Sequence, residues 1–435
     1  MAAAFLSVLI TAIRVSIYVN HFTTGELMAR TGLIAWAVGS LFFLYGFALR
    51  VSPSVMVDEL MREFHVSALV LGNLSAIYFY VYAAVQIPVG VMMDRIGPRV
   101  LMALACVLCG VGCFLFAAAE DIWLAYFGRF LIGLGSAFTW VGVLTIIATS
   151  LPAKNFAGFT GGGQLAGTTG AILGQAPLAL GIEYFGWRSS LYGLGMFGIA
   201  LAAGLWATVQ PRVRDTVVAV PLRQSLKVAA GNPQTWWLAL VGMSLTGPVL
   251  AFAGLWGVPW FAAVRGVPRS EAAPLLSLVF VGWLLGAPLM GWLSDKIQRR
   301  VPLLIAGTLI SSTTIASVLY LPSLNLTVVA VLLFISGIGG AVMILTFAAG
   351  RDHNPEYARG AALGIINTCV VASGALLQPL IGALLDWQWD GQMRDGVRIY
   401  SADAYQHALL CVPLGALAGF LLTFRVKEGG RAGQH

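Results

Sequence analysis

Apolar runs of about 20 residues recur twelve times along this chain of 435 residues. A helix rises 1.5 Å per residue, so about 20 residues cross the ~30 Å hydrocarbon core of a bilayer. Charged residues make up only 10% of the chain, whereas soluble domains carry about 25%. We therefore predict an all-α membrane protein with 12 transmembrane helices. The spans are expected near residues 32–57, 67–93, 100–119, 122–148, 158–182, 189–209, 236–263, 272–294, 301–320, 325–349, 359–385 and 405–425.

One charged turn appears in each half of the chain. Residues 90–99 read Gly-Val-Met-Met-Asp-Arg-Ile-Gly-Pro-Arg, and residues 291–300, which begin 201 positions later, read Gly-Trp-Leu-Ser-Asp-Lys-Ile-Gln-Arg-Arg. Both fit the pattern G-x-x-x-D-[RK]-x-x-x-R, and both follow a membrane-length apolar run. Reuse of one unit at a fixed offset indicates that the chain is built from two related halves.

A polar interior stretch from Gln210 to Thr235 separates six apolar spans from six. It is the natural cytoplasmic linker between the halves. We therefore expect an N-terminal bundle at residues 31–209, a linker at 210–235, a C-terminal bundle at 236–427 and a tail at 428–435. Residues 1–30 are an N-terminal extension, and either an interfacial helix or an over-long gene start would account for them. No function is assigned to this extension.

The placement of lysine and arginine sets the expected orientation of the spans. With the N-terminus inside, the inner segments hold 17 of the 25 basic residues. These are Arg14, Arg30, Arg95, Arg99, Lys154, Arg212, Arg214, Arg223, Lys227, Lys296, Arg299, Arg300, Arg351, Arg359, Arg425, Lys427 and Arg431. The outer segments hold Arg62, Arg188, Arg265, Arg269, Arg394 and Arg398. We therefore expect a multi-pass protein of the inner (cell) membrane with both termini cytoplasmic.

Further glycine motifs extend the repeat. Gly133-Leu-Gly135 in the fourth span matches Gly337-Ile-Gly339 in the tenth at an offset of 204. Parallel six-helix halves with a site between them are one known transporter architecture. With the repeated turn, and with Arg129 opening the signature R-x-x-x-G-x-G, the chain resembles the major facilitator superfamily (MFS) over nearly all of residues 30–425. The resemblance implies the MFS fold, in which two pseudo-symmetric six-helix bundles rock about a central cavity.

In that family the charged turn is understood as a conformational latch that favours the outward-open state. Its carboxylate can meet a helix N-terminus or a basic side chain, and its glycine permits close helix approach. The latch residues implied here are Gly90, Asp94, Arg95, Arg99, Gly291, Asp295, Lys296 and Arg300. The alternative is a topology signal alone, because any short inner loop attracts basic residues. Glycines expected to pack helices are Gly133, Gly135, Gly170, Gly174, Gly337 and Gly339.

Two full charges lie well inside the expected spans, Arg50 in the first and Arg129 in the fourth. At 1.5 Å per residue both are expected roughly 10 Å below the outer surface. An arginine at mid-span costs about 2.5–3.5 kcal/mol, so each requires water, a polar partner or an anion. For Arg50 we predict contact with an anionic substrate, the alternatives being a hydrogen bond to carbonyls freed near Pro53 or a side chain that snorkels toward the outer surface. For Arg129 the structural alternative is favoured.

Acidic residues are absent from the middle of the expected spans. Proton-driven symporters usually carry a buried carboxylate or histidine whose pKa is shifted. His407 lies near the outer end of the last span, where a structural role is favoured. The pattern favours facilitated diffusion or anion exchange over proton coupling through a buried acid, although a substrate carboxylate can carry the proton itself.

Neutral polar and aromatic side chains offer a lining that suits a small organic solute. Tyr78, Tyr82 and Gln86 recur every four residues and so share one face of a helix. The residues expected to contact substrate are Arg50, Tyr45, Tyr78, Tyr82, Gln86, Arg129, Gln164, Trp256, Asn367 and Gln378. Tyrosine and tryptophan in membranes also serve as interfacial or packing residues, and that alternative stays open for each.

The predicted function is secondary active or facilitative transport of a small organic solute, a metabolite anion, by rocker-switch alternating access. Two alternatives stay open: a multidrug efflux antiporter, and a non-transporting membrane sensor on the same fold. The sequence carries no phosphate-binding motif, metal cluster or activated nucleophile, so we expect no enzyme, no cofactor and no nucleic-acid partner. The expected partners are the solute, the lipid bilayer and a coupling proton or exchanged anion, and the expected state is a monomer.

Overall fold

The computed structural model of this chain describes residues 24–152, 156–211, 222–321, 323–394 and 396–429. Within these residues, 12 helical spans are long and apolar enough to cross a membrane. The predicted all-α membrane fold with 12 transmembrane helices is therefore confirmed. The predictions for residues 1–23 and 430–435, for Lys154, and for Arg212 and Arg214 of the linker lie outside the described residues.

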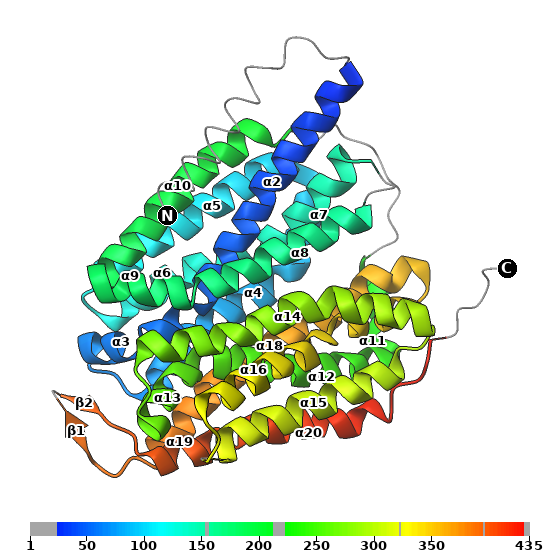
Figure 1. The fold of residues 1–435 in the computed structure, drawn as a ribbon. Coiled ribbons are helices and arrows are strands. Elements are labelled where there is room, and N and C mark those ends of the chain that lie inside the picture. The colour runs from blue at the N-terminus through cyan, green and yellow to red at the C-terminus, as the bar shows by residue number, and fades with distance from the viewer. Residues whose placement is uncertain (1–23, 153–155, 212–221, 322, 395, 430–435) are drawn as a thin grey trace.

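The N-terminal half forms the upper bundle in Figure 1. Its elements are α2 (Thr24–Val51), η2 (Ser52–Val55), α3 (Val57–Phe64), α4 (Ala68–Ile96), α5 (Pro98–Ala118), α6 (Ile122–Ser136), α7 (Thr139–Ser150), α8 (Phe156–Leu173), α9 (Ala176–Phe185) and α10 (Trp187–Thr208). Two expected spans are each built from two helices, α6 with α7 and α8 with α9. Pro177 explains the second break, because proline lacks an amide hydrogen and sits well only in the first turn of a helix.

The C-terminal half forms the lower bundle and ends in a short antiparallel hairpin and two helices. Its elements are α11 (Leu222–Gly231), α12 (Pro233–Gly247), η4 (Pro248–Trp256), α13 (Gly257–Arg265), α14 (Arg269–Ile297), α15 (Val301–Tyr320), α16 (Leu326–Ala341), α17 (Ile344–Asp352), η5 (Glu356–Ala358), α18 (Arg359–Trp387), β1 (Met393–Arg394), β2 (Val397–Arg398), α19 (Ala402–Ala408) and α20 (Cys411–Thr423). The break between α16 and α17 lies where the repeat places the break between α6 and α7.

The repeated charged turn has a residue with positive φ at the same position in both halves, although ψ differs between the two copies. Gly97 ends α4 with φ 90°, and Gln298 ends α14 with φ 56°. Glycine adopts positive φ at little cost, whereas a residue with a Cβ does so with strain. The Gln298 side chain donates to the carbonyl of Asp295 at 2.5 Å, which helps to hold this left-handed turn.

The two halves contact each other at the end of the molecule that carries the β1–β2 hairpin, hereafter the hairpin end (Figure 1). Helices α4 and α18 make the most extensive contact between the halves. A Cβ added to Gly72 would lie 2.7 Å from the carbonyl oxygen of Gln378, and one added to Gly374 would lie 3.0 Å from the Phe79 ring. Small residues thus let these helices approach closely.

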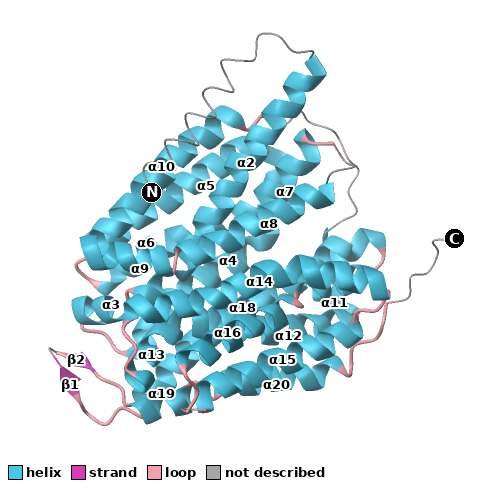
Figure 2. Ribbon diagram, viewed as in Figure 1, coloured by secondary structure: helices cyan, strands magenta, loops and turns pink. Residues whose placement is uncertain are grey.

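The opposite end carries the linker between the halves and the last described residues, and it is hereafter the linker end. Here a Cβ added to Gly90 on α4 or to Gly364 on α18 would meet no atom within 4 Å. The same holds for Gly291. The prediction that Gly90 and Gly291 bring neighbouring helices close is wrong for this conformation, because the halves spread apart toward the linker end, as Figure 2 shows.

The six glycines expected to pack helices all lie against a neighbouring helix. A Cβ added to Gly133 would lie 2.8 Å from the carbonyl oxygen of Tyr78, and one added to Gly174 would lie 2.6 Å from that of Ala48. At Gly135, Gly170, Gly337 and Gly339 it would meet the backbone of Ala105, Leu44, Val279 and Gly307, respectively. Each site therefore requires the absence of a side chain.

Candidate solute-binding site

Arg50 lies in the last turn of α2, where aromatic side chains surround its guanidinium. Its Nε donates to the hydroxyl of Tyr78 at 3.3 Å. The guanidinium carbon lies 4.1 Å from the ring centre of Phe47 and 5.1 Å from that of Tyr82. Cations are attracted to aromatic faces at these distances. Side chains of α2 and α4 therefore hold the charged group in place.

The positive charge of Arg50 has no carboxylate partner in the part of the chain that the structure describes. The residue is only 7% exposed, yet its terminal nitrogens are not among the enclosed polar atoms that lack a partner. The hydroxyl of Tyr82 is a further hydrogen-bond partner of the guanidinium, and two tyrosine hydroxyls leave some of its five N–H donors unused. A guanidinium with free donors suits a carboxylate, phosphate or sulfonate, which it can bind through two parallel hydrogen bonds.

Arg129 on α6 lies against the same turn of α2 and is 0% exposed. Its Nη1 donates to the carbonyl of Leu49 at 2.5 Å, and its Nη2 donates to the carbonyl of Arg50 at 2.8 Å. Because both terminal nitrogens are used and the side chain, including the enclosed Nε, is not accessible, a solute cannot touch it in this conformation. The predicted substrate contact of Arg129 is therefore wrong. The carbonyl contact that the sequence allowed for Arg50 belongs to Arg129 instead.

Tyr78, Tyr82 and Gln86 share one face of α4, as the four-residue spacing predicts. The rings of Tyr78 and Tyr82 stack with centroids 6.0 Å apart, and both residues lie near Arg50. Tyr78 is fully buried, so it orients Arg50 rather than contacting a solute. Gln86 is partly exposed, and its enclosed Nε2 lies beside the hydroxyl of Tyr82.

Tyr45 points into the interior of the N-terminal half. Its hydroxyl donates to the carbonyl of Leu194 on α10 at 2.8 Å, and its ring packs against Phe197. It is 1% exposed. The predicted substrate contact is therefore wrong, because this face of α2 is covered by α5 and α10 rather than by the other half.

Trp256 and Gln378 bind each other inside the C-terminal half. The indole Nε1 of Trp256 donates to the carbonyl of Gln378 at 2.9 Å, and the Gln378 side chain donates to the carbonyl of Leu250 at 2.8 Å. Both side chains are 0% exposed. They join η4 to α18, so their predicted substrate contact is wrong for this conformation.

Two other predicted amides remain available. Gln164 on α8 and Asn367 on α18 are half-buried, and neither side chain takes part in a hydrogen bond with the residues described. Gln175 is a functional residue that its sequence pattern did not single out: its Nε2 donates across the halves to the carbonyl of Ala253 at 2.6 Å. Its position before Pro177 marks the break between α8 and α9, which was the available signal.

Charged groups join the halves at the hairpin end. Arg269 on α14 pairs with Glu59 on α3 and donates to the carbonyl of Val55 at 3.1 Å. Asp386 on α18 accepts from the amide of Leu69 at 3.0 Å, at the N-terminus of α4. The partial positive charge of a helix N-terminus favours such a carboxylate. This end is therefore closed by polar bonds as well as by packing.

At the linker end, the latch side chains whose partners can be described pair within their own half. Arg99 donates to the carbonyl of Trp206 at 2.8 Å, and Arg300 pairs with Asp352 at 2.9 Å. Lys296 lies 5.0 Å from the ring centre of Trp292. The side chains of Asp94 and Arg95 lie outside the description. The latch role of the turn therefore stays a prediction.

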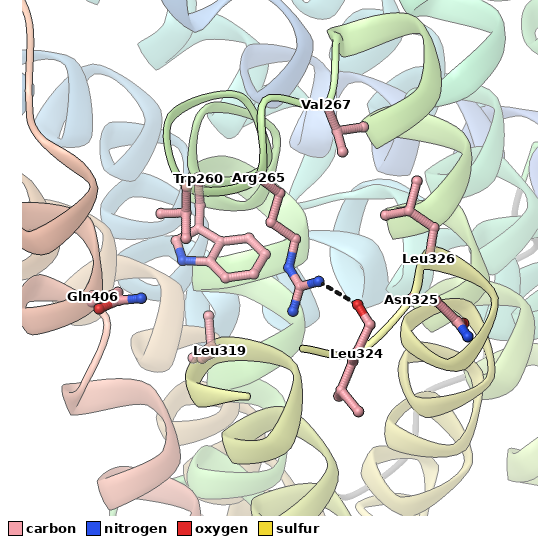
Figure 3. A pocket seen from close by; sticks show the side chains of 9 residues that line it. Trp260, Arg265, Val267, Leu319, Leu324, Asn325, Leu326 and Gln406 are labelled. Carbon is pink, nitrogen blue, oxygen red and sulfur yellow. Dashed lines mark hydrogen bonds between the residues drawn. The ribbon is translucent and has the colours of Figure 1, made fainter. Parts of the chain in front are cut away.

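A separate cavity of 370 Å³ lies at the hairpin end of the C-terminal half, shown in Figure 3. Trp260 and Arg265 line it, together with residues of α15, α16 and α19. Arg265 donates to the carbonyls of Leu324 at 2.8 Å and Leu321 at 3.0 Å, beyond the end of α15. Because the N-terminal half contributes none of the nine lining residues, we place the candidate site at Arg50.

Residues 38–379 match the Major Facilitator Superfamily, and the chain belongs to that family. It is 25% identical over 374 residues to a gentisate transporter of Corynebacterium glutamicum, covering 82% of each chain. It is 23% identical over 394 residues to the membrane sensor protein UhpC of Escherichia coli, covering 82% of this chain and 86% of that one.

A solved structure shares the fold. A bacterial homologue of the human lysosomal transporter Spinster, in an inward-facing and occupied conformation, matches with a TM-score of 0.74 at 20% identity. The match covers 92% of this chain and 97% of that one. The family and the fold are those of membrane transporters, as the repeat and the twelve spans predict.

Proposed function

We propose that this chain carries a small organic anion across the membrane, with Arg50 as the group that binds the negative charge. The observation that carries the proposal is the Arg50 guanidinium, which lies buried in the first span without a described carboxylate and with N–H donors that the surrounding tyrosines leave unused. A buried, unpaired cation is costly in a membrane, and a bound anion offsets that cost. The neutral amides of Gln86, Gln164 and Asn367 are the candidate groups for orienting the rest of the solute.

The names of related proteins support an anionic solute. Besides gentisate, relatives at 22–24% identity are named as transporters of galactarate or D-glucarate, sialic acid and sulfoacetate. Each of these solutes carries a carboxylate or sulfonate. The same feature disfavours efflux of cationic drugs, which a positive site would repel.

The proposed mechanism is alternating access. Polar bonds close the hairpin end, while glycines of the same helix pair meet open space toward the linker end. If basic loops lie in the cytoplasm, as the positive-inside rule expects, this conformation opens toward the cytoplasm of an inner membrane. Rocking of the halves would then break the hairpin-end bonds and bring the charged turns together. A proton or an exchanged anion is the proposed coupling ion.

Uptake into liposomes tests the proposal. The panel comprises gentisate, D-glucarate, sialic acid and sulfoacetate, with glucose and a lipophilic cation as uncharged and positive controls. Arg50→Ala should lower the uptake efficiency (kcat/KM) for anions at least about 100-fold, since hydrogen bonds to a charged group contribute about 1.5–3 kcal/mol and the group carries two donors. Arg359→Ala, which removes an exposed arginine, is the matched control and should keep uptake near wild type. Undiminished anion uptake by Arg50→Ala would refute the anion site.

A sensor without transport is the second candidate, because a membrane sensor protein is among the relatives. The two functions separate cleanly in a single preparation. A transporter both binds the anion, seen as a rise in melting temperature, and accumulates it in liposomes. A sensor shows the thermal shift without accumulation.

A further inference from the structure

The end of α2 lacks one backbone donor. Pro53 has no amide hydrogen, so it cannot donate to the carbonyl of Leu49 in an α-helical turn or to that of Arg50 in a 3₁₀ turn. The Ser52 hydroxyl donates to the carbonyl of Leu49 at 3.0 Å. Arg129 serves both carbonyls from another helix, at 2.5 and 2.8 Å.

These bonds act on the residue that carries the unpaired guanidinium. The carbonyl of Arg50 is held by Arg129, while its Nε is held by the hydroxyl of Tyr78. The guanidinium carbon of Arg129 lies 5.0 Å from the ring centre of that tyrosine. Gly133, one turn further along α6, lies against the Tyr78 backbone. Helix α6 therefore fixes both the backbone of Arg50 and the tyrosine that orients its side chain.

We propose that Arg129 is a positioning residue, which sets the place and direction of the Arg50 guanidinium by clamping two carbonyls at the end of α2, where Pro53 removes one backbone donor. This inference rests on the proposed anion site at Arg50. Arg129 itself does not touch the solute, because it is fully buried. The planar guanidinium binds two carbonyls in a fixed fork, a geometry that a lysine ammonium does not impose.

The test measures KM and Vmax for whichever of the four anions is taken up most. Arg129→Gln removes charge-assisted hydrogen bonds and should raise KM roughly tenfold, with a smaller change in Vmax. Pro53→Ala supplies an amide hydrogen at position 53, which can donate to either carbonyl. The double variant Pro53→Ala with Arg129→Gln should therefore recover part of the lost affinity, because the new amide replaces one of the two bonds. A direct contact between Arg129 and the solute would allow no such recovery.

Two further variants should give KM values between those of the wild type and Arg129→Gln. Arg129→Lys keeps the charge without the fork and should give an intermediate KM. Ser52→Ala removes the other donor to the Leu49 carbonyl but leaves Arg50 and Tyr78 held, so its KM should stay within about threefold of wild type. If Arg129→Gln fails to fold in detergent, Arg129→Lys with and without Pro53→Ala provides the same comparison.

The outcomes separate the two proposals. If Arg50→Ala keeps anion uptake, the proposed function fails and the positioning role fails with it. If Arg50→Ala loses uptake but Pro53→Ala restores nothing to the Arg129 variants, the anion site stands and the positioning role is overturned. A wild-type KM for Arg129→Gln also overturns the positioning role.

Discussion

In each half, a side chain from another helix donates hydrogen bonds to backbone carbonyls where the first span departs from α-helical geometry, but the donor differs between the halves. In the N-terminal half, Arg129 donates to the carbonyls at the end of α2. In the C-terminal half, where η4 interrupts the span, the neutral amide of Gln378 donates to the carbonyl of Leu250. At the repeat offset of 204, Arg129 corresponds to Leu333 and Gln378 to Gly174. Each half therefore draws its donor from a different helix of the repeat.

Because of this difference, the charged side chains inside the spans all belong to the N-terminal half. Charged side chains of the described C-terminal spans lie within three residues of a span end, whereas Arg50 lies five residues before the end of the span Arg30–Val55 and Arg129 lies seven residues into the span Ile122–Ser150. A charge there costs about 2.5–3.5 kcal/mol and a neutral amide far less. Under the proposed function, the N-terminal half holds the anion and the C-terminal half supplies neutral surface. A duplicated scaffold thus needs only one charged half to bind a charged solute.

The largest expected effect is a difference in anion affinity between a variant of the N-terminal half and a variant of the C-terminal half. Arg50→Ala should abolish the anion-induced rise in melting temperature, while Gln378→Leu should leave it unchanged. Gln378→Leu should instead lower the melting temperature without solute, because the carbonyl of Leu250 loses its donor at a cost of about 1–3 kcal/mol. Thermal unfolding in detergent, with and without the anion, measures both. Equal loss of anion binding in the two variants would show that the C-terminal half also holds the charge.

A second prediction concerns the bonds between the halves at the hairpin end. Asp386 accepts from the amide of Leu69 and from the hydroxyl of Tyr400. Burial and the nearby Asp386 carboxylate raise the pKa of Tyr400 well above that of a free phenol, so the hydroxyl stays protonated and donates. Asp386→Asn should weaken closure by about 1–2 kcal/mol, a 5–30-fold change in population.

Labelling measures that change. A cysteine placed at Ser67, before α4, should react with an impermeant maleimide faster in Asp386→Asn than in the parent. Glu356→Gln, an exposed acid at the linker end, is the control and should leave the rate unchanged. Equal labelling rates in all three proteins would mean that packing alone closes the hairpin end.

The smallest expected effect is on the melting temperature, when residues are exchanged between the two copies of the charged turn. Gln298 holds a positive φ that glycine adopts freely at Gly97. Gln298→Gly should therefore raise the melting temperature slightly, by relief of about 1 kcal/mol of strain, offset in part by loss of the bond to the Asp295 carbonyl. Gly97→Gln should lower it by more, because its φ of 90° with ψ of 163° lies in a region that essentially only glycine occupies. A higher melting temperature in both variants would contradict the conclusion that both positions require a positive φ.

Much of the fold could be predicted from residue patterns, because span length, basic loops and an internal repeat are one-dimensional signals. The buried charges Arg50 and Arg129 were also evident, since a charge within an apolar run stands out. The direction in which each side chain points could not be predicted from the sequence. Tyr45 lies on the first span with Arg50, yet it faces α10 inside its own half.

The sequence by itself determined twelve membrane helices, two related halves and two cations within apolar spans that require partners. Only the tertiary structure showed that Arg129 binds backbone carbonyls while Arg50 keeps unused donors, and which end of the molecule is closed. The physical reason is that helical periodicity fixes where a side chain lies on its own helix, while its neighbour depends on how helices rotate and approach. Arg129 meets the carbonyls near Pro53 only because α6 packs against the end of α2.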